Sequence, residues 1–97
     1  MKVIHGVKQG DYIFECRGCK CHHEVTTERK NDRGAQWQFN GNMNQPTFHP
    51  SIEVWHKGFD GTKQTDCHAI VSNGFIQYLP DCAHELKDQI IELPEIE

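Results

Sequence analysis

Cysteine and histidine recur together in three short segments that lie far apart in the chain. The first segment is Cys16-Arg17-Gly18-Cys19, and the later two are Cys67-His68 and Asp81-Cys82-Ala83-His84. Two residues between paired cysteines let both sulfurs reach one zinc ion at about 2.3 Å with tetrahedral angles. A tetrahedral ion needs two more ligands, which the later segments can supply. The spacing therefore predicts a fold in which distant turns are held together by one Zn²⁺ ion.

The favoured metal ligands are Cys16, Cys19, Cys67 and Cys82, and His68 or His84 can replace either late cysteine. A redox role for the Cys-x-x-Cys pair would require a thioredoxin-like βαβ context, which the flanking sequence lacks. Cys21 follows the pair so closely that it would strain to reach the same ion. We expect it to stay outside the site.

The length and composition also favour such a fastening. The 97 residues are 36% hydrophobic, which suits one domain with a modest core, and we expect a single zinc-binding domain over residues 1–97. Residues 1–11 lack the apolar stretch of a secretory signal, and no segment is apolar enough to span a membrane. We therefore expect a cytoplasmic protein, where an odd number of cysteines clustered with histidines is typical of metal binding.

Most of the chain carries β-strand signals. Residues 11–15 and 23–27 are rich in strand formers and flank the cysteine pair, which predicts a hairpin with the cysteines at its tip. Apolar and polar residues alternate over 35–40 and again over 51–56, the period of half-buried strands. Between them, the proline-containing segment 41–50 suits an ordered loop or a sheet edge.

A second hairpin is predicted around Asn73-Gly74, since both residues tolerate positive φ and separate two apolar runs, 67–71 and 75–79. Pairing with Ser72 opposite Phe75 would bring Cys67 near Cys82. Asp81 can then cap a short helix reaching about Gln89, and residues 90–93 can return as a short strand. The expected fold class is mainly β, a small α+β arrangement of zinc-fastened antiparallel hairpins with one short C-terminal helix.

The chain has seven histidines, and four of them neighbour the proposed ligands: His22, His23, His68 and His84. One interpretation is an open metal position that activates water, with Asp81 or Glu24 as general base. The other is that these histidines donate hydrogen bonds around a closed site or lie on the surface. We favour the second interpretation, because a closed four-ligand site has no position at which a substrate could bind.

The charge pattern bears on the partner. The formal net charge is −4, which disfavours nucleic-acid binding through phosphate neutralisation. The basic residues Arg29, Lys30 and Arg33 lie among turn formers and suit a solvated turn. The loop Gln45-Pro46-Thr47-Phe48-His49-Pro50-Ser51 is the most distinctive stretch, because its prolines pre-order it and a rigid loop costs less entropy on binding. If the protein has an interaction surface, we expect it there.

Four motifs together resemble a family of small phage and prophage proteins that often carry the label ammonia monooxygenase. They are Phe-x-Cys-x-x-Cys-x-x-x-His (Phe14–His23), Trp-x-Phe-Asn-Gly (Trp37–Gly41), Pro-Thr-Phe-x-Pro-Ser (Pro46–Ser51), and Cys67-His68 followed by Asp-Cys-x-His-x-Leu (Asp81–Leu86). The resemblance covers nearly the whole chain, although Arg17 and His49 depart from its usual residues. It implies a zinc protein in a phage or prophage setting and nominates His23, His68 and His84 beside the cysteines. The monooxygenase label would require membrane-spanning helices, which this polar chain lacks.

These observations favour a phage or prophage accessory protein that has a structural, zinc ribbon-like site and binds a host or phage protein, without enzymatic activity. The alternative is a small zinc-dependent hydrolase that uses His23, His68, His84 and Asp81 around an open metal position. Nucleic-acid binding through a ribbon-like knuckle is a third and weaker hypothesis.

Overall fold

The structure is a computed structural model that describes residues 1–96, and its regular elements are all β-strands. Their bounds are β1 Val3–His5, β2 Asp11–Cys16, β3 Cys21–Thr26, β4 Gln38–Phe39, β5 Phe48–His49, β6 Ile52–Lys57, β7 Lys63–Ser72, β8 Phe75–Tyr78 and β9 Ile90–Glu92. They form a three-stranded sheet β1-β2-β3, a two-stranded sheet β4-β5 and a four-stranded sheet β6-β7-β8-β9. The mainly β prediction is confirmed. None of the described residues belongs to a helix that could cross a membrane.

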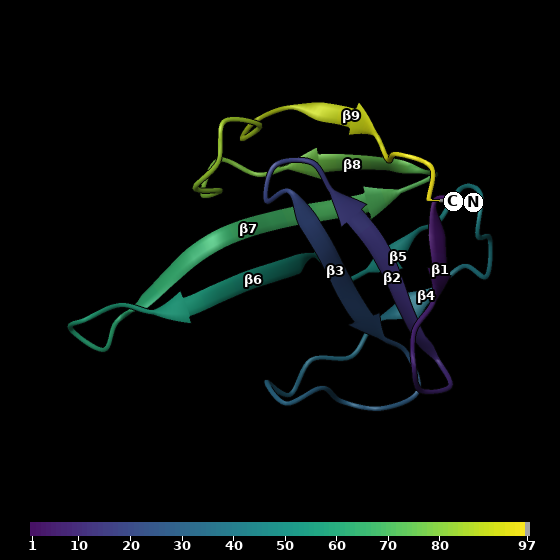
Figure 1. The fold of residues 1–97 in the computed structure, drawn as a ribbon, viewed down its shortest axis with the longest axis horizontal. Coiled ribbons are helices and arrows are strands. Elements are labelled where there is room, and N and C mark those ends of the chain that lie inside the picture. Colours follow the sequence, from purple (N-terminus) through teal and green to yellow (C-terminus); the bar gives the residue numbers. More distant parts are fainter. Residues whose placement is uncertain (97) are drawn as a thin grey trace.

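The three-stranded sheet crosses over the four-stranded sheet, with β2 and β3 lying across β6 and β7 (Figure 1). The core lies where they cross. Val3, Phe14 and Val25 from the first sheet and Ala69 and Ile76 from the second are all at most 1% exposed. Because successive strand residues point to opposite faces, one face of each strand fills this core and the other faces outward.

The β7–β8 hairpin has the register predicted from its turn. Ser72 pairs with Phe75, and Ala69 pairs with Tyr78. Asn73 and Gly74 both have positive φ, 50° and 83°, as a two-residue hairpin turn requires. The backbone N–H of Leu79 then donates to the carbonyl of His68, so the pairing continues beyond β8 toward Cys82.

The predicted C-terminal helix over 81–89 is wrong, because the described residues there form turns. The N–H of Ala83 donates to the carbonyl of Asp66 in β7, and the N–H of Asp88 donates to the carbonyl of Tyr78. These donors are therefore committed to the neighbouring strands. Asp88 also has a φ of 66°, outside the helical region. A segment this short gains little from helix propagation, so tertiary bonding decides its conformation.

The loop Pro46–Ser51 is held against the β7–β8 turn. The N–H of Gly74 donates to the carbonyl of Pro46 at 3.0 Å, and the N–H of Asn73 donates to Thr47 Oγ1 at 2.9 Å. At the other end of the loop, the indole Nε1 of Trp37 donates to the carbonyl of Ser51 at 3.2 Å. The loop that was predicted to be ordered is therefore fixed at both ends, immediately before β6.

Phe48 anchors the middle of this loop in the core. It is 2% exposed, and its ring stacks on Phe39 with centroids 4.8 Å apart. Phe48→Ala is expected to lower the free energy of unfolding by about 3–5 kcal/mol, because truncation of a buried phenylalanine leaves a cavity. Urea denaturation measures this effect. Phe59→Ala is the matched control, since Phe59 is fully exposed and its removal should change stability by less than about 0.5 kcal/mol. Equal effects from the two variants would contradict this packing.

Candidate active site and metal centre

Three strands and a turn bring a thiol cluster together inside the fold. The cluster consists of Cys16 at the end of β2, Cys19 in the following turn, His23 in β3 and Cys67 in β7. One ligand atom from each of these four residues lies within 4.8 Å of those of the other three. Cys16 Sγ and Cys67 Sγ are 4.0 Å apart, although the residues are 51 positions apart in the chain. The predicted meeting of the two distant segments is therefore present in the structure.

Strand geometry explains why these side chains meet. Phe14 and Cys16 share the inward face of β2, and Phe14 pairs with His23 across the hairpin, so His23 also points inward. Cys67 occupies the buried face of β7 together with Ala69 and is 2% exposed. The two sheets thus present sulfur and imidazole ligands to the same interior point.

The thiols of the cluster oppose one another's ionisation. The hydrogen bond between Cys16 and Cys67 lowers the pKa of Cys16 to about 2, although burial acts in the opposite direction. Burial, followed by the charge on Cys16, raises the pKa of Cys19 to about 12. The pKa of Cys67 is also raised, first by its hydrogen bond with Cys16 and then by burial. One thiolate thus opposes ionisation of its neighbours, and a divalent cation would remove that conflict.

Two further contacts fit a metal centre. The Nε2 atom of His23 is buried and has no hydrogen-bond partner among the described residues, which is costly for an imidazole nitrogen unless a metal binds it. Tyr78 Oη lies 3.3 Å from Cys16 Sγ and can donate to the thiolate. The backbone N–H of Cys19 also donates to this sulfur, at 3.3 Å. The residues present therefore fit a metal ion, with three sulfurs and one imidazole as ligands.

Cys82 and His84 form a second group with Cys67 that could hold a metal ion. Cys67 therefore belongs to both groups. The His84 ring packs edge-on against Tyr78, with centroids 4.7 Å apart, and it lies so close to Gly18 that a Cβ there would overlap it. Gly18 thus allows the cysteine turn to rest on His84. The Nε2 atom of His84 is also buried without a partner among the described residues.

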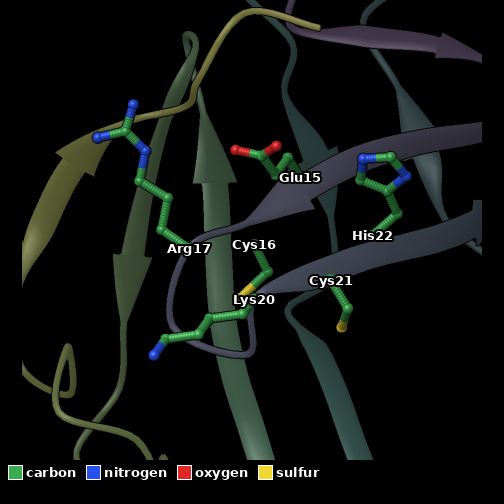
Figure 2. A pocket seen from close by; sticks show the side chains of 6 residues that line it. All are labelled: Glu15, Cys16, Arg17, Lys20, Cys21 and His22. Atoms are coloured by element: carbon green, nitrogen blue, oxygen red, sulfur yellow. The ribbon is translucent and has the colours of Figure 1, made fainter.

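Cys21 and His22 lie outside both groups. They line an open pocket of ≈ 470 Å³ at the tip of the β2–β3 hairpin, together with Glu15, Cys16, Arg17 and Lys20. The side chain of Cys21 is separate from that of Cys16 (Figure 2), and Cys21 is exposed. Glu24, considered above as a general base, lies on the exposed face of β3 and belongs to neither group.

His68 takes part in a different arrangement, on the outer face of β7. Its Nε2 atom lies 3.0 Å from Ser51 Oγ, and its Nδ1 atom lies 3.0 and 3.2 Å from the two carboxylate oxygens of Asp81. We call Ser51, His68 and Asp81 the triad. His68 and Asp81 were among the predicted site residues, whereas Ser51 was missed as a functional residue.

The sheet brings the triad together from three neighbouring segments. Glu53 pairs with His68 across β6 and β7, so Ser51, two residues earlier in the chain, lies diagonally beside His68 on the same face. Asp81 follows β8 on the other side of β7. The His68 and Asp81 side chains are 26% and 51% exposed, so the outer face of the triad is open to solvent.

The hydrogen-bond chemistry sets the protonation pattern of the triad. A carboxylate only accepts hydrogen bonds, so His68 Nδ1 carries the proton and donates to Asp81. The Nε2 atom of the neutral ring is then an acceptor, and the Ser51 hydroxyl donates to it. This is the arrangement in which histidine can take a proton from a serine nucleophile.

A serine, a histidine and an aspartate in this order of contact have the arrangement that serine hydrolases use, and here they lie on a β-rich scaffold with a separate thiol cluster. Comparison with protein families matches residues 2–79 to BubE, described as a bacterial ubiquitination-like system serine protease. The match covers more than half of the 97 residues, and the chain belongs to this family. Comparisons with curated proteins and with solved structures gave no significant match.

Proposed function

We propose that this protein is a serine protease that cleaves a peptide bond in a bacterial ubiquitination-like system. The observation that carries the proposal is the unbroken contact from Ser51 Oγ through both ring nitrogens of His68 to the Asp81 carboxylate, at 3.0 Å on each side. The family description supports the same chemistry independently of the geometry. The second part of the proposal, that the protease acts in a bacterial ubiquitination-like system, rests on that family description alone.

The proton moves in the reaction as follows. Ser51 Oγ attacks the substrate carbonyl carbon while its proton passes to His68 Nε2. The imidazolium, held by Asp81 through Nδ1–H, returns that proton to the leaving amine, and the C–N bond breaks. Water then attacks the acyl-enzyme ester, giving its proton to His68 Nε2, and Ser51 regains a proton when the acid product leaves. Serine and histidine act here as nucleophile and general base, then general acid.

Glu53 adds negative charge beside the triad. The hydrogen bond from Lys63, at 2.7 Å, lowers the pKa of Glu53, and Thr65 also donates to its carboxylate, at 2.8 Å. Glu53 therefore remains ionised as it faces His68 across the strand pair. This places a carboxylate directly beside the histidine of the triad.

We further propose that the thiol cluster holds one structural Zn²⁺, bound by Cys16, Cys19, Cys67 and His23. Three thiolates and one imidazole are a typical set for a closed structural zinc site, in which no coordination position is left for substrate. Zinc would supply stability to the fold in this site. The outer face of β7 carries the chemistry, and its inner face carries the metal ligands.

The expected zinc-dependent hydrolase is less well supported by the geometry. It would gather His23, His68, His84 and Asp81 around one ion. In the described structure His23 and His84 belong to different groups, and His68 and Asp81 lie with Glu53 in a third group. Binding of a host or phage protein stays a prediction and is compatible with protease activity, because a protease also binds its protein substrate. The phage or prophage setting likewise stays a prediction.

Covalent labelling tests the proposed activity. A fluorophosphonate probe should form a stoichiometric adduct with the protein, and peptide mass spectrometry should place the adduct on Ser51. Ser72 provides an internal control, because it is the only other serine in the chain and lies at the end of β7, paired with Phe75. Absence of an adduct, or equal modification of both serines, would defeat the assignment.

A further inference from the structure

Two dipeptides connect the triad with the interior of the fold. In Cys67-His68, the cysteine points inward to the thiol cluster and the histidine points outward to the triad. In Asp81-Cys82, the aspartate is exposed and the cysteine is 5% exposed. Each of these triad residues thus has a buried cysteine as its direct neighbour, on the opposite face of the chain.

Cys82 bridges the two dipeptides. The backbone N–H of His68 donates to Cys82 Sγ at 3.2 Å, and the Cys82 thiol donates to the carbonyl of His68, also at 3.2 Å. The N–H of Cys82 donates to the carbonyl of Leu79, which closes the turn that contains Asp81. The Cys82 sulfur therefore attaches the turn that contains Asp81 to the backbone of His68, the residue that Asp81 orients.

We infer that Cys82 is a positioning residue of the triad, a role that rests on the proposed serine protease function. Its thiol sets the distance between the Asp81 carboxylate and His68 Nδ1 by fixing the backbones that carry them. In this role Cys82 Sγ accepts from the backbone N–H of His68 and lies 3.2 Å from the His68 carbonyl oxygen. Cys82 also lies close to Cys67 and His84, so the zinc content of Cys82 variants distinguishes this positioning role from metal binding.

The exposure and contacts of Asp81 show why the attachment of its turn to the His68 backbone matters. Asp81 is half exposed, and among residues 1–96 its carboxylate hydrogen-bonds to the side chain of His68 only. The carboxylate therefore depends on its backbone for its position. A displacement of about 1 Å in a catalytic group can lower a rate by about a hundredfold. Loss of the Cys82 thiol should thus slow the reaction without removing any reacting atom.

Three variants test this role. Cys82→Ala removes both hydrogen bonds, Cys82→Ser keeps a donor and acceptor on a shorter bond, and Cys21→Ala is the matched control at an exposed thiol. With the fluorophosphonate probe, Cys82→Ala should lower the maximal labelling rate by about a hundredfold, with little change in the probe concentration at half-maximal rate. Cys82→Ser should recover part of the rate, and Cys21→Ala should match the unmodified protein.

Two readouts are independent of activity. In ¹⁵N-histidine spectra, Cys82→Ala should lose the Nδ1-protonated form of His68 that Asp81 selects, and Cys82→Ser should retain part of it. Both Cys82 variants should keep one equivalent of zinc. A loss of zinc from Cys82→Ser would overturn the inference, since Cys82 would then be a metal ligand. An unchanged labelling rate and unchanged His68 spectrum in Cys82→Ala would also overturn it.

The two proposals can fail separately. If the unmodified protein gives no adduct at Ser51, the protease function fails, and the His68 spectra still decide whether Cys82 orients the ring. If Ser51 is labelled and Cys82→Ala reacts as fast as the unmodified protein, the protease function stands and the positioning role of Cys82 is wrong.

Discussion

Ser51→Ala and His68→Ala are each expected to lower hydrolysis of an activated ester by at least about 10³-fold. Ser51 supplies the attacking oxygen and His68 accepts its proton, so neither variant retains the nucleophile in a reactive form. Ester hydrolysis measured with p-nitrophenyl acetate reports the loss of acyl transfer directly. Fluorophosphonate labelling should fall with it.

Asp81→Asn should have a smaller effect than either of these variants, about 10²-fold to 10³-fold. The asparagine can present its amide N–H to His68 Nδ1 and thereby select the wrong tautomer, which removes the acceptor facing Ser51. Asp81 is half exposed, however, so water also solvates His68 and part of its orienting effect is already screened. The order of the three effects thus follows from the geometry.

The same variants should be strongly non-additive. Ser51→Ala combined with Asp81→Asn should be no slower than Ser51→Ala alone, because His68 and Asp81 act only through the serine. Ser72→Ala is the matched control and should retain full activity. Multiplying effects in the double variant would show that Asp81 acts outside the triad. Thermal unfolding of each variant separates lost chemistry from lost structure.

The thiol cluster could be anticipated from the sequence because its cysteines carry local signals. The Cys-x-x-Cys spacing identifies one half of the cluster, and the Asn73-Gly74 turn fixes the β7–β8 register. His23 was a candidate because it neighbours the proposed ligands and because the resemblance nominates it, but it was not among the four favoured ligands. Its place in the cluster follows from its pairing with Phe14, which spacing along the chain does not reveal.

Ser51 could not be identified in the same way. A serine is unremarkable at a strand start, and its meeting with His68 depends on the β6–β7 register. The connection between these strands, residues 58–62, is longer than a tight turn, and the pairing shifts between Val54 and Trp55. The available signal was the proline-ordered loop that ends at Ser51, which was predicted as the place to look for an interaction surface.

The prediction of a helix in the C-terminal segment was wrong for a related reason. Asp81 resembles a helix cap when it is considered with the residues that follow it. In the structure its carboxylate accepts from His68, and the next backbone donors bond to other strands. Local capping signals favour a helix only when tertiary partners do not claim the same groups. Ser51 and Asp81 are both polar residues whose local sequence suggests an ordinary role, at a strand start and at a helix cap. In the structure each of them contacts His68, which is distant in the chain.

Removal of the metal is expected to unfold the protein. Structural zinc contributes an apparent ~10–16 kcal/mol in small zinc peptides at neutral pH, which equals or exceeds the ~5–15 kcal/mol net stability of a typical domain. Cys67 joins the two sheets at the cluster, so Cys67→Ser should lose both the metal and the cooperative unfolding transition. Elemental analysis and urea denaturation measure these two losses, and Cys21→Ser should preserve both properties.

The comparison of Cys67→Ser with Ser51→Ala separates the two faces of β7. Ser51→Ala should keep one equivalent of zinc and the unfolding midpoint of the unmodified protein while losing acyl transfer. Cys67→Ser should lose zinc, stability and acyl transfer together, because His68 is held by the same strand. If chelation leaves a folded protein that still labels at Ser51, the cluster does not fasten the sheets. If Ser51→Ala loses zinc, the triad and the metal are one site, since a purely structural ion has no reason to depend on an outward-facing hydroxyl.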